Sequence, residues 1–164
     1  MINNRLIIVG AGQYGILAKE IAESIGVFTK IDFVDDQSPL AIQKTKNLKD
    51  MRQDYDAVVV AIGDHCVRLQ FLGLARDLGY KIVTLVHPKA YVSPSAKIGE
   101  GCIVEPNVTI QTNATIGEGC IISSGAVINH NAIIEKGCHV DCNATVSARS
   151  VVQEKTKIES GQVY

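Results

Sequence analysis

The sequence of 164 residues has almost no net charge and no long hydrophobic run. Its lysines and arginines number 16 and its aspartates and glutamates 17, a formal net charge of −1. Neither a basic surface for nucleic acid nor an acidic tail is therefore indicated. No apolar stretch reaches the roughly eighteen residues that a membrane-spanning helix needs. Because Arg5 and Leu6 begin a predicted strand rather than a signal peptide, we expect a soluble, cytoplasmic protein.

Disulfide and metal chemistry are not indicated either. The cysteines are Cys66, Cys102, Cys120, Cys138 and Cys142, and no pair has zinc-ligand spacing with matching histidines. Three of them, Cys102, Cys120 and Cys138, are spaced eighteen residues apart. Stacked parallel side chains rarely meet the dihedral requirement of a disulfide, and a reducing cytosol disfavours the bond. We interpret these cysteines as small core residues and expect no metal site.

Leucine, methionine and phenylalanine are absent after residue 88. All nine leucines, both methionines and all three phenylalanines precede it, whereas β-branched residues, glycine, asparagine and alanine dominate the remainder. This contrast is typical of a helix-containing domain followed by an all-strand solenoid. We therefore predict two domains, residues 1–87 and 88–164.

The second part repeats every six residues. From Val92 to Ile158 every sixth residue is isoleucine or valine, and the fourth position of each hexad is usually small. A period of six fits neither an α-helix nor a plain strand. Three hexads make a coil of eighteen residues with three flat faces, so the pattern predicts a left-handed parallel β-helix of hexapeptide repeats. The segment IGEGC recurs at Ile98 and Ile116 and, in degenerate form, at Ile134.

The first part alternates strands and helices, which predicts a small Rossmann-like α/β domain with a parallel sheet. We expect Gly26 to end the first helix. The expected helices span about 16–24 and 65–78, and the expected strands are Arg5–Val9, Lys30–Val34, Asp56–Ile62 and Lys81–Val86.

A G-x-G-x-x-G motif, formed by Gly10, Gly12 and Gly15, follows the first strand. Its glycines permit a tight turn and a close backbone approach to phosphate, and the following helix offers free N–H groups. Asp35 or Asp36, after the second strand, can take a ribose hydroxyl. The alternative is that the glycines serve packing alone. A dinucleotide site needs two such halves and this domain has one, which favours a nucleotide diphosphate sugar over NAD.

Gly63, Asp64 and Arg68 follow the third predicted strand, at the same carboxyl edge of the sheet. They could complete the nucleotide pocket. Equally, Asp64 could cap the next helix while Arg68 remains in solvent.

Polar residues also interrupt the hexads, at Asn129-His130-Asn131, and His139 follows nine residues after His130. The hexad position of His130 displays its side chain at a corner between faces. A neutral imidazole there could take a proton from an amine or hydroxyl that attacks a thioester, although a lone histidine is more often structural. Nine residues are half a coil. If both histidines serve one site, they must therefore meet across a subunit boundary.

The chain resembles, from residue 5 to about 160, the bacterial sugar-nucleotide acyltransferases of the hexapeptide-repeat superfamily. This family includes the UDP-amino-sugar N-acetyltransferase of the N-acetylbacillosamine pathway and sialic-acid O-acetyltransferases. The resemblance rests on IIVGAGQYG, FVDD, AIGD followed by Arg68, VHPKAYVSPSAKIG and SGAVINHNAIIEKGCHV. It implies a homotrimer that binds acetyl-CoA in the groove between two subunits and the sugar nucleotide on the N-terminal domain.

The resemblance also implies roles for individual residues. His130 matches the general base, and His139 a histidine that contacts acetyl-CoA. Ala148 and Ser160 align with further positions along the acetyl-CoA groove. The positions that match contacts to the nucleotide sugar are Gly12, Gln13, Tyr14, Asp35, Asp36 and Gly63.

Two features depart from the family pattern. The residue after the catalytic histidine is usually a carboxylate that raises the basicity of the imidazole, and here it is Asn131. An amide can hold a tautomer but cannot offset the charge of an imidazolium; in a tightly coupled pair this exchange costs as much as about 10⁴ in rate. The chain also stops at Tyr164 in mid-coil, which is consistent with truncation of the β-helix at its C-terminus.

The sequence thus favours acetyl-CoA-dependent N-acetylation of a UDP-linked amino sugar in surface-glycan biosynthesis. In this scheme His130 acts as the base and Asn131 orients it. One alternative is O-acetylation of a sialic acid or another sugar hydroxyl. Another is a sugar-nucleotide-binding homologue with impaired catalysis, which Asn131 and the short C-terminus would both explain.

Overall fold

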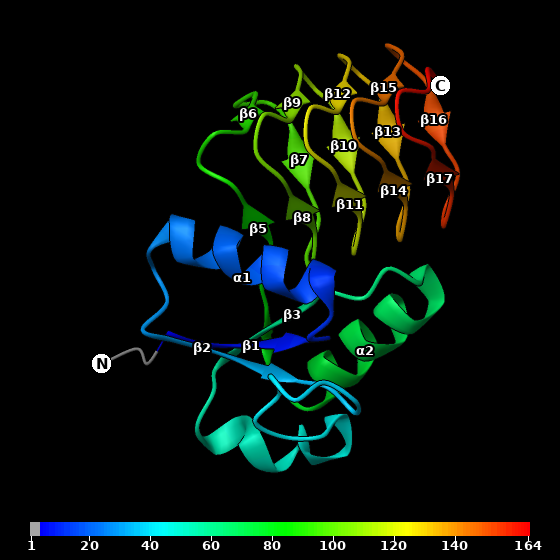
Figure 1. Ribbon diagram of the computed structural model, residues 1–164. Helices are drawn as coiled ribbons and strands as arrows, with labels where there is room; N and C mark the ends of the chain where they lie inside the picture. Colours follow the sequence, from blue (N-terminus) through cyan, green and yellow to red (C-terminus); the bar gives the residue numbers. More distant parts are fainter. Residues whose placement is uncertain (1–3) are drawn as a thin grey trace.

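The computed structural model describes residues 4–164, which form a small α/β domain and a β-helix (Figure 1). Residues 1–3 of the predicted first domain lie outside the described residues. The α/β domain contains a parallel sheet in the order β2-β1-β3-β4. Its elements are β1 (Arg5–Val9), α1 (Gln13–Ile25), β2 (Lys30–Val34), two 3-10 turns (Thr45–Asn47 and Asp50–Gln53), β3 (Ala57–Val60), α2 (His65–Asp77) and β4 (Lys81–Ile82).

The two helices cover opposite faces of this sheet, because successive side chains of a strand point to opposite sides. Ile8 of β1 packs in one apolar cluster with Ala18 of α1. Its neighbour Ile7 packs in another cluster, with Leu72 of α2. Neither helix, nor any other within residues 4–164, is long and apolar enough to cross a membrane.

Helix α1 begins at Gln13, three residues before its predicted start, because the G-x-G-x-x-G motif supplies its first turn. It ends as predicted at Gly26, whose φ of 72° lies in the left-handed region. Strands β1 and β2 have their predicted bounds.

The predicted fourth strand, Lys81–Val86, was wrong as a single element. Lys81–Ile82 pairs with β3 in the α/β domain, whereas Leu85–Val86 (β5) pairs with Ile103–Val104 in the β-helix. Val86 lies six residues before Val92 and so continues the hexad register backwards. The β-helix therefore begins a few residues before position 88.

The β-helix consists of three parallel sheets, in the orders β16-β13-β10-β7, β17-β14-β11-β8-β5 and β15-β12-β9-β6. We call the second of these the domain-facing sheet. Its neighbours in the ladder are eighteen residues apart, as Ile121 opposite His139 illustrates. The strands are β6 (Tyr91–Val92), β7 (Lys97–Ile98), β8 (Ile103–Val104), β9 (Thr109–Ile110), β10 (Thr115–Ile116), β11 (Ile121–Ile122), β12 (Val127–Ile128), β13 (Ile133–Ile134), β14 (His139–Val140), β15 (Thr145–Val146), β16 (Val151–Val152) and β17 (Lys157–Ile158).

The hexad isoleucines and valines fill the β-helix together with the small residues of the fourth hexad position. Cys102, Cys120 and Cys138 are fully buried there, and all five cysteines are free thiols. Each of the three buried thiols donates to a backbone carbonyl of the next coil, for example Cys120 to Glu135. They are core residues, as predicted.

The α/β domain covers the outer side of the domain-facing sheet (Figure 1). Ile103 and Ile121 point outward from this sheet, yet they are 0% and 1% exposed. Tyr91, which points outward from another sheet, is 59% exposed. Ile103 belongs to the same apolar cluster as Leu6 of β1, so the two domains share a core.

Helix α2 packs against a column of glycines. The turns that follow β7, β10 and β13 contain Gly101, Gly119 and Gly137, each with positive φ. A Cβ added at Gly119 would lie 2.8 Å from Leu72 Cδ1 and 3.0 Å from Leu69 Cδ2. We call this column the glycine corner. Its recurring IGEGC segments lie against the leucines of α2.

Candidate functional site

The glycines of the G-x-G-x-x-G motif have different roles. Gly10 has a φ of 99°, and a Cβ there would lie 2.8 Å from the carbonyl oxygen of Ala61. A Cβ on Gly15 would collide with the carbonyl oxygen of Gly10. Gly12, by contrast, has open space beside it, with no heavy atom within 4 Å of an added Cβ. Gly10 and Gly15 shape the turn, and Gly12 leaves its outer side free.

The N-terminus of α1 is open to an anion. Gly12 is the N-cap and supplies no side-chain hydrogen bond, and the first turn carries no acidic residue. Gln13 next to it is exposed. Free N–H groups at a helix N-terminus together with its dipole favour a phosphate. The geometry is therefore compatible with the predicted diphosphate.

Asp35 and Asp36 lie beside this turn, and both already have protein partners. Asp35 accepts hydrogen bonds from the backbone N–H groups of Ala11 (2.8 Å), Gln37 (2.8 Å) and Ser38 (2.9 Å). These bonds, that of Ala11 foremost, lower the pKa of Asp35. The Asp36 carboxylate binds Thr45. Asp35 thereby connects the G-x-G-x-x-G turn to the loop after β2. The oxygens of its carboxylate keep lone pairs that could accept a hydrogen bond from a ribose hydroxyl.

A cavity of about 310 Å³ opens at the carboxyl edge of the sheet. Gly63, at the end of the loop after β3, is exposed near this edge. Asp64 caps α2, since its Oδ1 accepts the N–H of Val67 at 2.9 Å, which is the structural alternative for that residue. The cavity is lined by Gly10, Asp35, Asp36, Gln37, Thr45, Ile62 and Phe71.

The structure contradicts both predictions for Arg68, which placed it in the nucleotide pocket or in solvent. Its side chain neither lines the nucleotide cavity nor lies in solvent, because the residue is 0% exposed. Its guanidinium donates to carbonyl oxygens of Ile62 and Gly63 in the loop after β3, and to those of Gly119 and Gly137 at the glycine corner. Because its side chain is buried and makes four hydrogen bonds to backbone carbonyl oxygens, Arg68 is not available to contact a sugar nucleotide directly.

His130 and Asn131 occupy an exposed turn on the far side of the β-helix from the α/β domain. They follow β12, in the turn that leads to β13, and Asn131 has a φ of 58°. The Asn131 side-chain nitrogen lies 2.9 Å from His130 Nδ1. Ala148 lies in the corresponding turn of the next coil, where the N–H of Arg149 donates to the carbonyl oxygen of His130. His130 and Ala148 therefore share one corner.

His139 lies on the domain-facing sheet, which is the face opposite that corner. Its Nε2 is 3.1 Å from the Ser123 hydroxyl. Burial lowers the pKa of His139, and the nearby Asp141 carboxylate opposes this shift. The separation expected from half a coil is observed: within one chain the two histidines lie on opposite sides of the β-helix.

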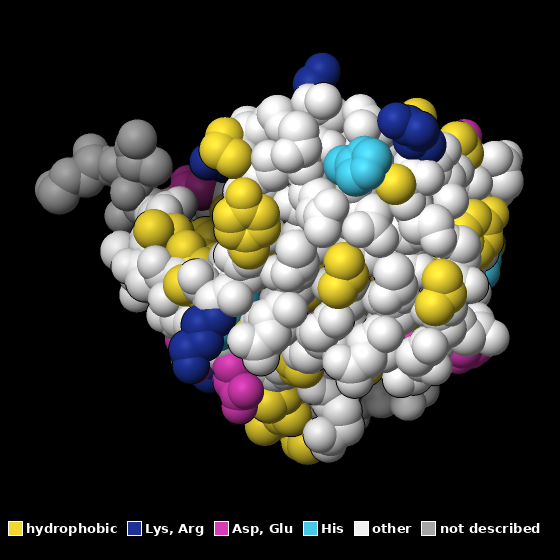
Figure 2. Space-filling view, turned by 90° about the horizontal axis from the view of Figure 1, so that it is seen from above, with side chains coloured by type: hydrophobic (Ala, Val, Ile, Leu, Met, Phe, Trp, Pro, Cys, Tyr) yellow, Lys and Arg dark blue, Asp and Glu magenta, His cyan; other side chains and the backbone are white. Residues whose placement is uncertain are grey.

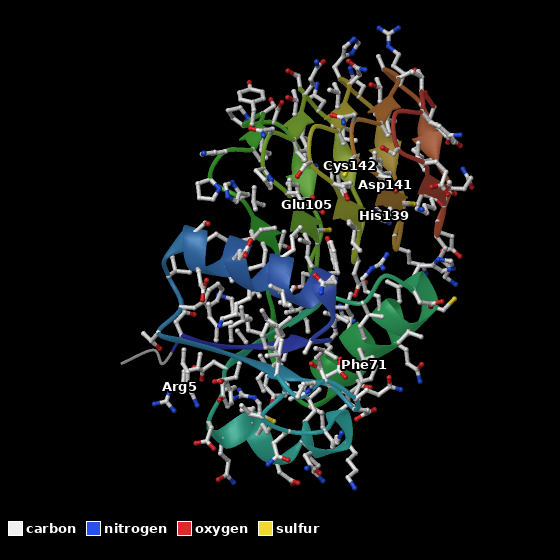
Figure 3. The ribbon with its side chains drawn as sticks, viewed as in Figure 1. Arg5, Phe71, Glu105, His139, Asp141 and Cys142 are labelled. Carbon is white, nitrogen blue, oxygen red and sulfur yellow. The ribbon has the colours of Figure 1, made fainter. Side chains whose placement is uncertain are left out.

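Polar residues that sequence reasoning did not link to His139 lie on the same part of the β-helix. Figure 3 shows Asp141 and Cys142 next to His139, and Glu105 farther along the β-helix, where it follows β8. Glu105 is only 4% exposed and accepts hydrogen bonds from the backbone N–H and the hydroxyl of Ser124, at 3.0 and 2.9 Å. The hexad register places Glu105 and Asp141 at equivalent turn positions, thirty-six residues apart, a signal that could have found them.

The Tyr14 hydroxyl of α1 is buried without a hydrogen-bond partner. Burial raises the pKa of Tyr14 well above its usual value, and the nearby Glu105 carboxylate raises it further. The residue as a whole is partly exposed, so a ligand would touch atoms of Tyr14 other than this oxygen.

Ser160 lies in the turn after β17, where its hydroxyl donates to the carbonyl oxygen of Cys142 at 2.8 Å. The three positions aligned with the acetyl-CoA groove, His139, Ala148 and Ser160, are thus not adjacent in one chain. Among residues 4–164, no three side chains of His, Cys, Asp or Glu are grouped so as to hold a metal ion.

Two families of known proteins match the two domains in order. Residues 5–73 match the PglD N-terminal domain, and residues 95–130 match the bacterial transferase hexapeptide with six repeats. A UDP-N-acetylbacillosamine N-acetyltransferase from Bacillus subtilis (strain 168) is 45% identical over 49 residues, which are 28% of this chain and 21% of that relative. This match therefore spans about a fifth of the relative's length.

Solved structures share the whole fold. The acetyltransferase domain of PglB from Neisseria gonorrhoeae FA1090, in complex with acetyl coenzyme A, has a TM-score of 0.94 at 29% identity over 98% of this chain and 82% of that one. A mutant of GDP-perosamine N-acetyl transferase from Caulobacter crescentus, in complex with CoA and GDP-perosamine, has a TM-score of 0.67 at 24% identity over 96% and 90%. The predicted fold, an α/β domain followed by a β-helix, is confirmed.

The matched regions, their order along the chain and the shared fold agree with one another. The N-terminal match contains the G-x-G-x-x-G turn and the cavity beside it, and the C-terminal match includes His130. In these two segments and in its fold, the chain is similar to the hexapeptide-repeat sugar-nucleotide acyltransferases.

Proposed function

We propose that this protein transfers the acetyl group of acetyl-CoA to the amine of a nucleotide-linked amino sugar. The observation that carries the proposal is His130, an exposed imidazole whose Nδ1 lies beside the Asn131 amide on an otherwise regular coil. The Neisseria gonorrhoeae structure at 29% identity contains acetyl coenzyme A, which supports this thioester as the donor. UDP is the nucleotide we favour, because the Bacillus subtilis relative is named for a UDP sugar.

In the proposed reaction, the amine nitrogen attacks the thioester carbonyl while His130 takes the amine proton. The tetrahedral intermediate collapses, the carbon–sulfur bond breaks, and the imidazolium returns the proton to the CoA thiolate. Backbone N–H groups near the thioester would stabilise the oxyanion. For Nε2 to act as the base, Nδ1 must carry a proton. The Asn131 amide must then turn its oxygen toward Nδ1 to accept that hydrogen bond.

The α/β domain is proposed to hold the sugar nucleotide. Support comes from the free helix N-terminus at Gly12 and Gln13, and from the cavity next to Asp35 and Asp36. The diphosphate would lie on the N–H groups of α1, and a carboxylate would accept a ribose hydroxyl. Gly63 would contact the ligand at the cavity rim.

A homotrimer with active sites between subunits is part of the proposal. His130 and His139 lie on opposite sides of one β-helix, so a site that uses both requires a second chain. Ile133 and Val151, neighbours on β13 and β16, are each 43% exposed. Figure 2 shows few charged side chains on the side of the β-helix away from the α/β domain. A stacked apolar pair on such a surface suits packing against another copy.

An assay of released CoA tests the function. The purified protein is incubated with acetyl-CoA and a panel of UDP- and GDP-linked amino sugars, free amino sugars and a sialic acid. We expect turnover with a nucleotide-linked amino sugar, and a loss of about 10²–10⁴-fold in kcat for His130→Ala. His87→Ala, which removes another histidine of the β-helix, serves as the matched control.

Undiminished turnover in His130→Ala would remove the proposed base. Turnover with the sialic acid alone would favour transfer to a hydroxyl. Calorimetric binding of a UDP-sugar without binding of acetyl-CoA would identify a homologue without catalysis.

A further inference from the structure

One buried side chain bonds both to the loop beside the nucleotide cavity and to the β-helix. Arg68 Nη1 donates to the carbonyl oxygens of Ile62 at 2.7 Å and Gly63 at 2.8 Å. Its Nε donates to Gly119 at 2.7 Å, and its Nη2 to Gly137 at 2.9 Å. Residues far apart in the sequence are thereby held around one planar guanidinium.

The chemistry of this group explains why an arginine is needed. A guanidinium carries five N–H donors in a rigid, planar fork, whereas a lysine ammonium is a single point with three donors. A buried charge is costly unless hydrogen bonds compensate it. Here four carbonyl oxygens do so. Because the fork is rigid, two of these bonds fix the direction of the other two.

The loop that Arg68 holds belongs to the nucleotide cavity. Ile62 lines that cavity together with Asp35 and Asp36, and the carbonyl oxygen of Ile62 is one of the acceptors of Arg68. On the other side, Gly119 and Gly137 belong to two successive coils of the β-helix, on which the proposed acetyl transfer takes place. The guanidinium therefore links the acceptor side of the reaction to the donor side.

We propose that Arg68 is a positioning residue that sets the nucleotide cavity in register with the acetyl-transfer coils. This inference rests on the proposed function. Domains of one chain move relative to each other unless their interface holds them, and a misplacement of about 1 Å at a reacting centre can cost about 10²-fold in rate. Arg68 prevents this displacement without touching either substrate.

The test compares Arg68→Met and Arg68→Lys with Leu69→Ala. Leu69 packs against the same glycine corner, at Gly119 and Gly137, but has no hydrogen bond to the Ile62–Gly63 loop. KM and kcat are measured for the nucleotide amino sugar and for acetyl-CoA, and calorimetry gives Kd for each ligand alone. Urea unfolding shows that each variant is folded under assay conditions.

For Arg68→Met we expect KM and Kd for the nucleotide sugar to rise about tenfold or more, with a fall in kcat. Kd for acetyl-CoA should stay within about twofold, as should all constants of Leu69→Ala. If Arg68→Met does not fold, Arg68→Lys should show a smaller shift in the same direction.

Equal shifts in the Arg68 and Leu69 variants, or a rise confined to acetyl-CoA, would refute the positioning role. If the wild-type protein acetylates no nucleotide amino sugar, the proposed function fails. The binding of UDP-sugar by calorimetry then still decides the role of Arg68: an unchanged Kd overturns it.

Discussion

The packing of α2 on the glycine corner leads to a quantitative prediction for Gly119→Ala. The new Cβ would lie 2.8 Å from Leu72 Cδ1 and 3.0 Å from Leu69 Cδ2, too close for either side chain to stay in place. Overpacking of a core costs about 1–3 kcal/mol. The φ of 65° adds about 1 kcal/mol for a residue with a Cβ. We therefore expect Gly119→Ala to lower the free energy of unfolding by about 2–4 kcal/mol.

Gly161→Ala is the matched control. Gly161 occupies the same position of a hexad turn, with a φ of 72°, but nothing lies within 4 Å of its added Cβ. Gly161→Ala should lower the free energy of unfolding by only about 1 kcal/mol, the cost of positive φ in a residue with a Cβ. Urea unfolding, with a slope of about 2 kcal/mol per molar, should place the midpoint of Gly119→Ala about 1 M below that of the control.

A double-mutant cycle isolates the contact itself. In a Leu72→Ala background the clash with Leu72 disappears while that with Leu69 remains, so Gly119→Ala should then cost less than in the wild-type background but more than Gly161→Ala. If Gly119→Ala and Gly161→Ala are equally destabilised in the wild-type background, α2 does not restrict this corner and the reasoning is wrong.

Three further predictions concern the candidate site. Gly15→Ala should abolish the calorimetric binding of a UDP-sugar, because its Cβ would collide with the carbonyl of Gly10. Gly12→Ala should fold normally, because the space beside Gly12 is open. Asn131→Asp should move the acidic limb of the pH–rate profile to higher pH, since a carboxylate beside His130 stabilises the imidazolium; an unchanged limb would argue against their coupling. Burial lowers the pKa of His139, so the unfolded chain binds more protons and stability should fall as the pH decreases from about 6.5 toward the folded-state pKa. His139→Gln should flatten urea-derived stability over that range, and an equal slope in both proteins would contradict this.

The hexad pattern predicted the β-helix core almost residue by residue, because its period is imposed by geometry. An inward-facing position recurs every six residues, and from Val104 to Ile158 these positions are buried. Val86 satisfies the same period but was assigned to the α/β sheet. A two-residue strand of a β-helix and the end of a longer strand have the same composition, so only the register distinguishes them.

The contacts between the domains could not be predicted from the sequence. Arg68 bonds to backbone carbonyl oxygens of residues 51 and 69 positions away, and a carbonyl acceptor leaves no mark on residue type. Glu105 was missed for a related reason: its partner Ser124 is nineteen residues away, one coil and one residue further. Motifs locate groups that lie close in sequence, whereas these residues act where distant segments meet.

One part of the interface is nevertheless encoded in the repeat. Asn107, Asn131 and Lys155 adopt positive φ in equivalent hexad turns, so positive φ alone does not require glycine. Glycine occupies this position in the first three turns of the glycine corner, where α2 lies, and Lys155 replaces it in the fourth. The glycines at this position lie against Leu69 and Leu72 of α2, whereas Lys155, one coil further on, lines a cavity together with Cys66 and Leu69 near the N-terminus of α2. The glycines of the repeat therefore record where the leucines of α2 pack most closely on the β-helix.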